Sequence, residues 1–473
     1  MRKIVFIFIL LSIAFFSCKK DNFTTNPNDK LTFSVDTLMF DTIFTTIGST
    51  TLNFKVYNKN SQSIKLDKIK LARGKDSPYR LNINGYKVNE LSNIEIKSND
   101  SIFIFVEVTI DPGRNKMIEQ DSILFIYNGN SQDIDLVSFG QDVHLVNSVE
   151  LTDNTTWTNN IPHLVYNYVY LDSSKTLTIE EGTIIYFHHN AGMFIHGTLI
   201  VNGTKDNPVI FRGDRLESFY DDIPGQWGGI QLLSGGGQST INYAEIKNAI
   251  VGVQVGTLGG STGESLTLTN TKIFNMNYAG IYAMASQINS FNCIIANCGF
   301  YNAALLVGGT YNFYHCSFAN YWSLSNRSTP EIVITNNFET NDAMYVGNLH
   351  EANFKNCIIH GNIKTEIGFN NNAAYEFNYF LENCLLKYDV ADLSVSDATH
   401  YKNIFTKPSN DNLFLDINEN DYSLDTLSFA KDKGSIDVLN GFPFAFDITK
   451  DIEKEDRTTD TAPDLGAYER IEN

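Results

Sequence analysis

Cysteine, proline and helix-forming patterns are scarce in this chain of 473 residues. It holds 6 Cys and 10 Pro, so neither a dense disulfide framework nor a proline-rich disordered segment organises it. No long stretch spaces its apolar residues like an amphipathic helix. The chain is instead rich in Phe (33), Gly (32) and Tyr (23), a composition that favours short strands and turns. We therefore expect an all-β fold.

Positive charge and known catalytic motifs are also in short supply. The sequence has 35 Lys and Arg against 54 Asp and Glu, a formal net charge of -19. A field of this sign repels phosphates, so we expect no nucleic acid partner. No P-loop, HExxH or zinc-type Cys/His spacing occurs. We therefore expect no cofactor or metal, with a calcium ion in an acidic loop left open.

The chain opens with MRKIVFIFILLSIAFFSCKKD, in which Arg2 and Lys3 precede an apolar run that ends at Phe16. The run is too short for a permanent membrane helix and has the proportions of a secretory signal. A small residue followed by Cys18 resembles a bacterial lipobox. The resemblance implies that residues 1–17 are a signal peptide and that Cys18 becomes lipidated. The alternative is a plain secretory signal with an incidental cysteine.

The polar residues 18–30 suit a flexible, lipidated tether. The KKD after the lipobox is similar to the Lys-plus-acidic tether that sends Bacteroidetes lipoproteins to the cell surface. This resemblance implies a membrane-attached, outer-membrane lipoprotein that is surface-exposed. A periplasm-facing orientation is the alternative.

Residues 31–145 contain short alternating runs such as LTFSVDTLMF, SIFIFVEVTI and VSFGQDV, separated by turn residues. This pattern predicts a β-sandwich of about seven strands. It resembles the Hydin-type immunoglobulin-like domains found ahead of other modules in bacterial surface lipoproteins. No catalytic motif accompanies it, so we expect a spacer or docking domain.

From residue 146 onward a short frame repeats, formed by Asn, a small residue, any residue and a large apolar residue. The second positions of this frame, at 244, 271, 293, 316, 336, 357 and 384, recur every 20 to 27 residues, with the fit looser from 336 onward. A period of this length with short strands and no helices is typical of a β-solenoid. It resembles the right-handed parallel β-helix of the pectin-lyase-like superfamily, which we expect over residues 146–399.

Two positions of each repeat are expected to form a structural ladder along the solenoid. Asn tolerates the left-handed backbone of a sharp corner, and stacked Asn amides can hydrogen-bond between coils. The next position accepts Ala, Thr and Cys, which indicates a requirement for small size and burial and none for a thiol. The ladder comprises Asn270, Asn292, Asn356, Asn383, Cys293, Cys316, Cys357 and Cys384. If Cys18 is lipidated, five of the six cysteines remain, so at least one is unpaired.

Residues 400–473 are expected to form the last coils and a C-terminal cap. The closing APDLGAYE resembles the C-terminal end of many secreted bacterial β-helix proteins. A solenoid end exposes an unpaired strand edge, so capping is physically required.

Catalytic residues stay unknown, with Asp221 and Asp222 as candidates. Polygalacturonase-type hydrolases share Asn-x-Asp, an Asp pair, Gly-His-Gly and Arg-x-Lys elements, and of these residues 146–473 contain the Asp pair alone. Paired carboxylates can serve as general acid and base. However, neighbouring side chains in an insertion between coils point apart, which favours plain solvated charge. His188 and His189 should face opposite sides of a strand, one in the core, which disfavours a shared metal.

Aromatic residues of the later coils are candidate sugar-stacking groups, because ring faces offer apolar area beside polar edges. They include Tyr311, Phe313, Tyr314, Tyr321, Trp322 and the stretch 373–380. The alternative is that these rings fill coil interiors. The sequence thus favours a lipid-anchored binding or adhesion module for glycans or surface proteins. Whether it is an enzyme is uncertain; a polysaccharide lyase or glycoside hydrolase is the first alternative, and a structural surface element is the second.

Overall fold

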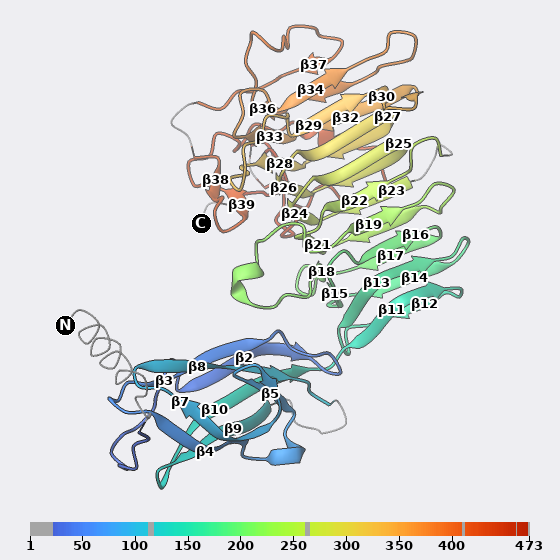
Figure 1. Cartoon of the computed structure of the whole chain (residues 1–473). Coiled ribbons are helices and arrows are strands. Elements are labelled where there is room, and N and C mark those ends of the chain that lie inside the picture. Colours follow the sequence, from blue (N-terminus) through green and yellow to red (C-terminus); the bar gives the residue numbers. More distant parts are fainter. Residues whose placement is uncertain (1–21, 112–117, 261–264, 409–411, 460, 472–473) are drawn as a thin grey trace, which may run out of the picture. The chain divides into compact units, whose positions relative to one another are not determined.

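The computed structural model describes residues 22–111, 118–260, 265–408, 412–459 and 461–471. These residues form an almost entirely β structure, which confirms the predicted fold class, and they divide into two compact units between Val143 and His144 (Figure 1). The short helices are η1 (Gly74–Asp76), η3 (Ser218–Tyr220) and α2 (Ile436–Asn440). None of the described helices has the length and apolar composition needed to cross a membrane.

The first unit is a β-sandwich of two sheets. One sheet has the strand order β1-β3-β8-β5-β6, and the other has the order β2-β10-β9-β4-β7. The strands are β1 (Thr32–Phe33), β2 (Thr37–Phe44), β3 (Leu52–Asn58), β4 (Ile64–Leu71), β5 (Tyr79–Ile83), β6 (Tyr86–Lys87), β7 (Glu90–Ile96), β8 (Asp100–Val108), β9 (Ile118–Tyr127) and β10 (Asn130–Gln141). Alternation decides which side chains enter the core: in β8, Ile102, Ile104 and Val106 are buried, whereas Phe103 and Phe105 point outward.

The second unit is a parallel β-helix whose coils each contribute strands to three faces. Face 1 contains β12 (Thr155–Trp157), β14 (Thr176–Glu180), β17 (Thr198–Asn202), β20 (Ser239–Asn242), β23 (Ser265–Thr269), β32 (Leu349–Lys355), β35 (Phe380–Glu382) and β37 (Tyr401–Lys402). Face 2 contains β15 (Ile184–Phe187), β18 (Val209–Gly213), β21 (Ala244–Lys247), β24 (Lys272–Met276), β26 (Ile294–Cys298), β28 (Ser317–Asn320), β33 (Ile358–Gly361) and β36 (Leu385–Leu386). Face 3 contains β16 (Gly192–Ile195), β19 (Gly229–Leu232), β22 (Val251–Val255), β29 (Ile332–Thr335) and β34 (Ile367–Asn370).

Four longer strands bend from one face to the next. β11 (His144–Leu151) and β13 (His163–Leu171) pass from face 2 to face 3, and β25 (Ala279–Phe291) and β27 (Tyr301–Tyr314) pass from face 3 to face 1. β25 bends at Ala285, which adopts a φ of 47°. Each strand pairs in parallel with its counterpart one coil away, so that like positions stack along the solenoid.

The interior of the coils is one continuous apolar core of mainly Val, Ile and Leu side chains. Trp227 is fully buried there, and its ring lies 4.0 Å from that of Phe187, with an interplanar angle of 8°. Its indole Nε1 donates a hydrogen bond to the carbonyl of Lys247 at 2.9 Å, so the polar edge is satisfied inside the core.

The last coil and the flank of the β-helix are both covered by later parts of the chain. Tyr388, Leu393 and Val395 pack against the end of the apolar core. The rest of the described chain, residues 412–459 and 461–471, is called the C-terminal segment. It contains the hairpin of β38 (Phe414–Asp416) and β39 (Asp421–Leu424), and it lies along face 2. The other hairpin, β30 (Asn337–Glu339) and β31 (Met344–Val346), projects from face 3.

Candidate functional site

The corner between face 1 and face 2 carries the ladder asparagines. Asn270, Asn292, Asn356 and Asn383 have φ values of 49°, 53°, 52° and 51°, all in the left-handed region. Asn292 Nδ2 donates to Asn270 Oδ1 of the preceding coil at 3.2 Å. His315 occupies the same corner with φ 49°, and Asn356 Nδ2 lies 2.9 Å from its Nε2.

The C-terminal segment covers this corner. Asn292 Nδ2 donates to the carbonyl of Lys450 at 2.7 Å. Asn356 exchanges two hydrogen bonds with the backbone of Ser435, at 3.1 and 2.9 Å. The corner amides therefore hold this segment in place and are turned away from solvent.

The ladder cysteines point into the core. Cys293, Cys316, Cys357 and Cys384 are fully buried and unpaired, as is Cys298. Burial raises the pKa of the Cys293 and Cys357 thiols, and it raises the pKa of Cys298 to about 12. Protonated, inaccessible thiols such as these three are poor nucleophiles and poor metal ligands. Cys18 lies outside the described residues.

Asp221 and Asp222 lie in the insertion between β18 and β19, directly after η3. Asp221 Oδ1 accepts a hydrogen bond from the Arg212 guanidinium at 2.9 Å. Asp222 Oδ1 accepts from Asn275 Nδ2 at 2.9 Å and from Asn420 Nδ2 at 3.2 Å. The two carboxylates thus have separate partners, so the structure gives no arrangement in which they act as one acid and base pair.

His188 and Asp214 form a hydrogen-bonded pair near this insertion. His188 Nδ1 lies 2.7 Å from Asp214 Oδ2, and the imidazole stacks on the ring of Tyr166 at 4.0 Å. The Asp214 side chain is 13% exposed and that of His188 is 45% exposed. Burial raises the pKa of Asp214, and the hydrogen bond with His188 opposes this shift. A carboxylate that orients a half-exposed imidazole is an arrangement suited to proton transfer.

Sequence reasoning missed this pair and misplaced the histidines. The expectation that one of His188 and His189 enters the core was wrong, because β15 ends at Phe187 and the strand alternation ends with it. The signal was present in the repeat, since Phe187 pairs with Gly213, so His188 and Asp214 follow equivalent strands one coil apart.

The aromatic residues predicted as sugar-stacking groups are mostly buried. Tyr311 and Phe313 face the coil interior. Tyr314 packs against Phe442 of the C-terminal segment, with ring centroids 5.1 Å apart. Trp322 is 8% exposed. In the stretch 373–380, the Tyr379 ring stacks at 4.3 Å on Phe369 in the last coils.

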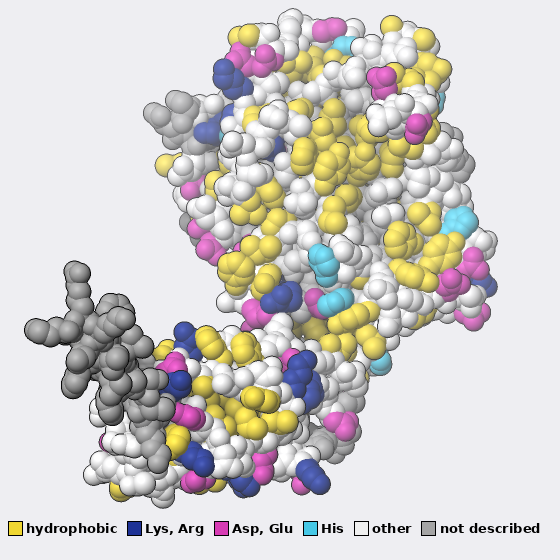
Figure 2. All heavy atoms as spheres, viewed as in Figure 1, with side chains coloured by type: hydrophobic (Ala, Val, Ile, Leu, Met, Phe, Trp, Pro, Cys, Tyr) yellow, Lys and Arg dark blue, Asp and Glu magenta, His cyan; other side chains and the backbone are white. Residues whose placement is uncertain are grey.

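A different set of rings lies on the outer side of face 3. We call it the aromatic surface; it consists of Tyr278, Tyr282, Phe300, Tyr301, Phe338 and Tyr345. Tyr278 and Phe300 precede equivalent strands, and their ring centroids lie 5.1 Å apart. Tyr278 also lies 5.7 Å from Tyr282 and 6.1 Å from Tyr301. Phe300 is 47% exposed, and Figure 2 shows hydrophobic side chains gathered on the surface of the β-helix unit.

Buried apolar side chains support the aromatic surface from beneath, and its tyrosines contribute phenol hydroxyl groups. Met284, Ala304 and Leu306 pack beneath Tyr282, Tyr301 and the hairpin of β30 and β31. Burial and the neighbouring Tyr278 raise the pKa of Tyr282 to about 12. The Tyr282 phenol therefore stays neutral and can donate and accept hydrogen bonds.

The coils that carry most of this surface are free of charge. Between Lys272 and Arg327 the sequence contains no Asp, Glu, Lys or Arg. This run is the sequence signal that could have located the aromatic surface. It is notable in a unit whose residues 144–473 hold 18 Lys and Arg and 38 Asp and Glu, a formal charge of -20.

Acidic side chains also gather in a crevice of about 650 Å³ between the C-terminal segment and β24, lined by Glu419, Asp421, Asp451 and Glu453 among others. Asp451 is committed to the backbone: Oδ1 accepts from the amides of Glu453 and Glu455, at 2.8 and 2.7 Å, and Oδ2 accepts from Glu469 at 2.7 Å. Within the described ranges, no three His, Cys, Asp or Glu side chains converge as a metal site would require.

Comparison with known proteins bears on the β-helix unit. Residues 149–294 match a family model described as a pectate-lyase-like beta helix domain. The match runs from the end of β11 to the start of β26 and includes the insertion that contains Asp221 and Asp222. No curated protein matches the chain. The parallel β-helix is therefore supported by both the family model and the strand pairing, while fold likeness by itself assigns no activity.

Proposed function

We propose that this chain is a lipid-anchored protein of the cell envelope whose β-helix binds glycans through the aromatic surface. The observation that carries the proposal is the cluster of half-buried to exposed rings of Tyr278, Tyr282, Phe300 and Tyr301 on charge-free coils. Clustered, partly exposed aromatic rings on a firm base are typical of binding surfaces.

The chemistry of this surface suits neutral sugar rings. A sugar presents an apolar C–H face that can lie on an aromatic ring, with hydroxyl groups around its edge. The phenols of Tyr278, Tyr282 and Tyr301 supply hydrogen-bonding groups beside the ring faces. The charge of -20 on residues 144–473 repels anionic polymers and leaves neutral glycans favoured.

The N-terminal segment is proposed to anchor the protein to the outer membrane at the cell surface. Lipidation of Cys18 would tether the chain to the outer membrane, with the β-sandwich as a Hydin-like spacer ahead of the β-helix, and KKD directs the protein to the surface. Incorporation of labelled palmitate should occur in the wild type and be lost in Cys18→Ala. Label that persists in the variant would contradict the anchor without touching the glycan proposal.

Affinity electrophoresis in gels that contain neutral polysaccharides tests the binding function. A retarding polysaccharide should bind the Phe300→Ala and Tyr301→Ala variants about 3- to 10-fold more weakly, because an aromatic contact contributes roughly 0.5–1.5 kcal/mol. Phe219→Ala is the matched control, since Phe219 is 74% exposed but belongs to η3. Equal loss in all three variants, or no retardation by any neutral polysaccharide, would contradict the proposal.

The second candidate function is polysaccharide cleavage, and the His188–Asp214 pair favours it. A lyase needs a base for proton abstraction, and a hydrolase needs a general acid; an oriented imidazole can serve either role. Reducing-end and unsaturated-uronate assays, with and without calcium, should detect cleavage. Turnover that is lost in His188→Asn and kept in His189→Asn would place catalysis at this pair and displace the binding-only function.

A further inference from the structure

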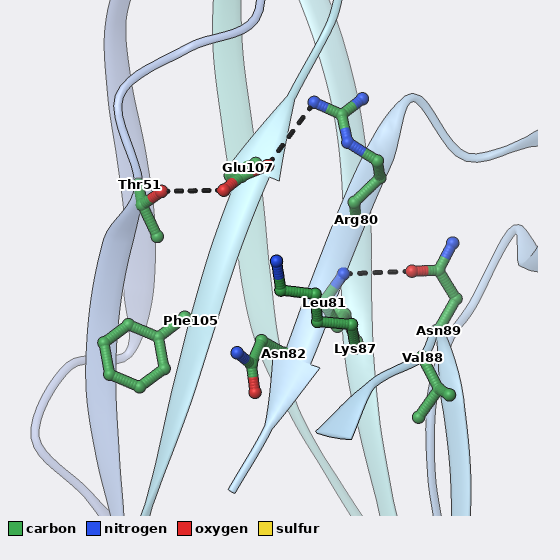
Figure 3. Close-up of a pocket in the computed structure, with 9 residues that line it drawn as sticks. All are labelled: Thr51, Arg80, Leu81, Asn82, Lys87, Val88, Asn89, Phe105 and Glu107. Atoms are coloured by element: carbon green, nitrogen blue, oxygen red, sulfur yellow. Dashed lines mark hydrogen bonds and ion pairs between the residues drawn. The ribbon is translucent and has the colours of Figure 1, made fainter. Parts of the chain in front are cut away.

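The outward side of the sandwich sheet β1-β3-β8-β5-β6 contains a groove of about 580 Å³, a size suited to a small ligand. Figure 3 shows its lining side chains, which come from β5, β6, β8, the residues that follow β6, and Thr51 directly before β3. The lining consists of Thr51, Arg80, Leu81, Asn82, Lys87, Val88, Asn89, Phe105 and Glu107.

The strand edge beside the groove is already closed by a side chain. Asn89 Oδ1 accepts a hydrogen bond from the amide of Leu81 at 2.9 Å (Figure 3), and Asn89 Nδ2 donates to the carbonyl of Tyr79 at 3.4 Å. These two backbone groups are the ones that an added peptide strand would need. A ligand of this groove must therefore be held by side chains.

Of the charged side chains that line the groove, Arg80 and Glu107 lie close together, whereas Lys87 does not take part in an ion pair with another described residue. Glu107 accepts a hydrogen bond from Thr51 Oγ1 at 2.8 Å and lies 3.7 Å from the Arg80 guanidinium. Arg80 also donates to Thr109 Oγ1 at 2.9 Å. Lys87 has no ion-pair partner among the described residues, and in Figure 3 its side chain extends into the space beside Asn82.

A short aromatic row continues the groove along β8. The rings of Phe105 and Phe103 are stacked, with centroids 5.9 Å apart and an interplanar angle of 23°, and Phe103 is 39% exposed. The Lys55 ammonium lies 4.7 Å from the Phe103 centroid. The row therefore has Lys55 over the Phe103 ring, while Asn82 and then Lys87 lie in register with Phe105 on the next two strands.

The charge of the chain is unevenly divided between its units. Residues 22–143 hold 13 Lys and Arg and 15 Asp and Glu, a formal charge of -2, against -20 for residues 144–473. An anionic ligand is thus repelled by the β-helix unit and much less by the sandwich.

We propose that this groove binds an anionic sugar residue. The apolar face of the sugar ring lies on Phe105, its carboxylate or sulfate pairs with the Lys87 ammonium, and its hydroxyls bond with the Asn82 amide. The proposal goes beyond the glycan site of the β-helix, because it concerns another unit and a ligand of opposite character.

Isothermal titration of the full chain with three oligosaccharides tests the proposal: a carboxylated oligogalacturonide, a sulfated chondroitin oligomer and a neutral galactan oligomer. At least one anionic oligomer should bind, with an affinity that falls as salt rises. Lys87→Ala should weaken it about 10-fold or more, because a hydrogen bond to a charged group contributes roughly 1.5–3 kcal/mol. Phe105→Ala should weaken it about 3- to 10-fold, because it removes an aromatic contact with the sugar ring.

Two controls separate this site from the rest of the molecule. Lys65→Ala removes the same charge from β4 of the other sheet and should leave binding unchanged. Tyr301→Ala removes a ring of the aromatic surface and should also leave it unchanged. Comparing the carboxylated with the sulfated oligosaccharide shows which anion the groove binds. No binding of either anion, equal binding of the neutral oligomer, or an affinity that Lys87→Ala does not change would overturn the proposal.

Discussion

The ring of Tyr278 lies 5.1 Å from that of Phe300, one coil further along the β-helix, and both precede strands that pair in register. The stacking of coils therefore creates a row of outward rings from residues 22 positions apart. Stacking of like positions is how a solenoid turns a repeated residue type into a binding surface.

Replacing Glu331 by Gln should stabilise the protein at neutral pH. Glu331 is fully buried, and only Oε2 is bonded, to Asn302 Nδ2 at 2.7 Å, while Arg327 makes a paired contact with the nearby Glu366. Burial and the charge of Glu366 raise the pKa of Glu331 well above its ordinary value. At neutral pH the Gln variant should unfold with a free energy greater by about 1–3 kcal/mol.

The pH dependence follows from the direction of that shift. Because the pKa of Glu331 is raised in the folded state, its ionisation destabilises the folded protein. This destabilisation is absent below the unfolded pKa of 4.5 and grows as pH rises above it. In thermal unfolding, the Glu331→Gln variant should be more stable than the wild type at pH 7, and this difference should disappear near the unfolded pKa. Glu339→Gln, at an exposed position, is the control. A gain that is equal at both pH values would contradict the assignment.

Removing Arg457 should release the C-terminal segment. Its guanidinium is fully buried and bonds to Glu469 and Asn292, each at 3.2 Å, and to the carbonyls of Gly466 and Ala467, each at 3.1 Å. Arg457→Ala leaves these acceptors unpaired and should cost about 3–5 kcal/mol.

Limited proteolysis reports this release directly. The Arg457→Ala variant should be cut within the C-terminal segment while the coils persist, whereas Lys454→Ala, at an exposed position, should resist like the wild type. Unchanged protease resistance of the Arg457 variant would show that the apolar contacts of Tyr422, Ile452 and Leu465 hold the segment alone.

Substitutions at Asn292 should separate its two roles. Asn292→Gly keeps the left-handed φ of 53° available but removes the side-chain hydrogen bonds, whereas Asn292→Ala loses both. Denaturant unfolding should rank wild type above Gly and Gly above Ala, with Ala lower than Gly by about 1–2 kcal/mol because of the backbone cost. If the two variants are equally stable, backbone conformation does not explain the choice of Asn.

The five described cysteines should not react with thiol reagents in the folded protein. All are fully buried, and burial raises the pKa of Cys293, Cys298 and Cys357. A chromogenic disulfide reagent should label them in denaturant and leave them unlabelled at neutral pH without it. Rapid labelling of the native protein would contradict the burial of these side chains.

The repeat was predictable because each coil places similar residues at similar positions. The Asn and small-residue frame around Asn292 and Cys293 marks a left-handed corner followed by an inward position, a local requirement that the sequence expresses directly. The period of these corners, together with the short strands between them, is sufficient to predict a β-solenoid.

The long-range contacts that place the candidate site residues were not predictable from local patterns alone. Tyr311 and Phe313 face inward because β27 bends near Val307 before reaching face 1. The C-terminal segment meets Asn292 through Lys450, 158 positions away, and no repeat signals that contact. His188 and Asp214 meet only because two coils stack in one register.

A structure of the chain in complex with a neutral oligosaccharide selected by affinity electrophoresis tests glycan binding by the aromatic surface most directly. A sugar ring should lie on Phe300 or Tyr278, with hydroxyl groups bonded to the phenols of Tyr282 or Tyr301. A sugar bound at His188 and Asp214, with the aromatic surface empty, would contradict it.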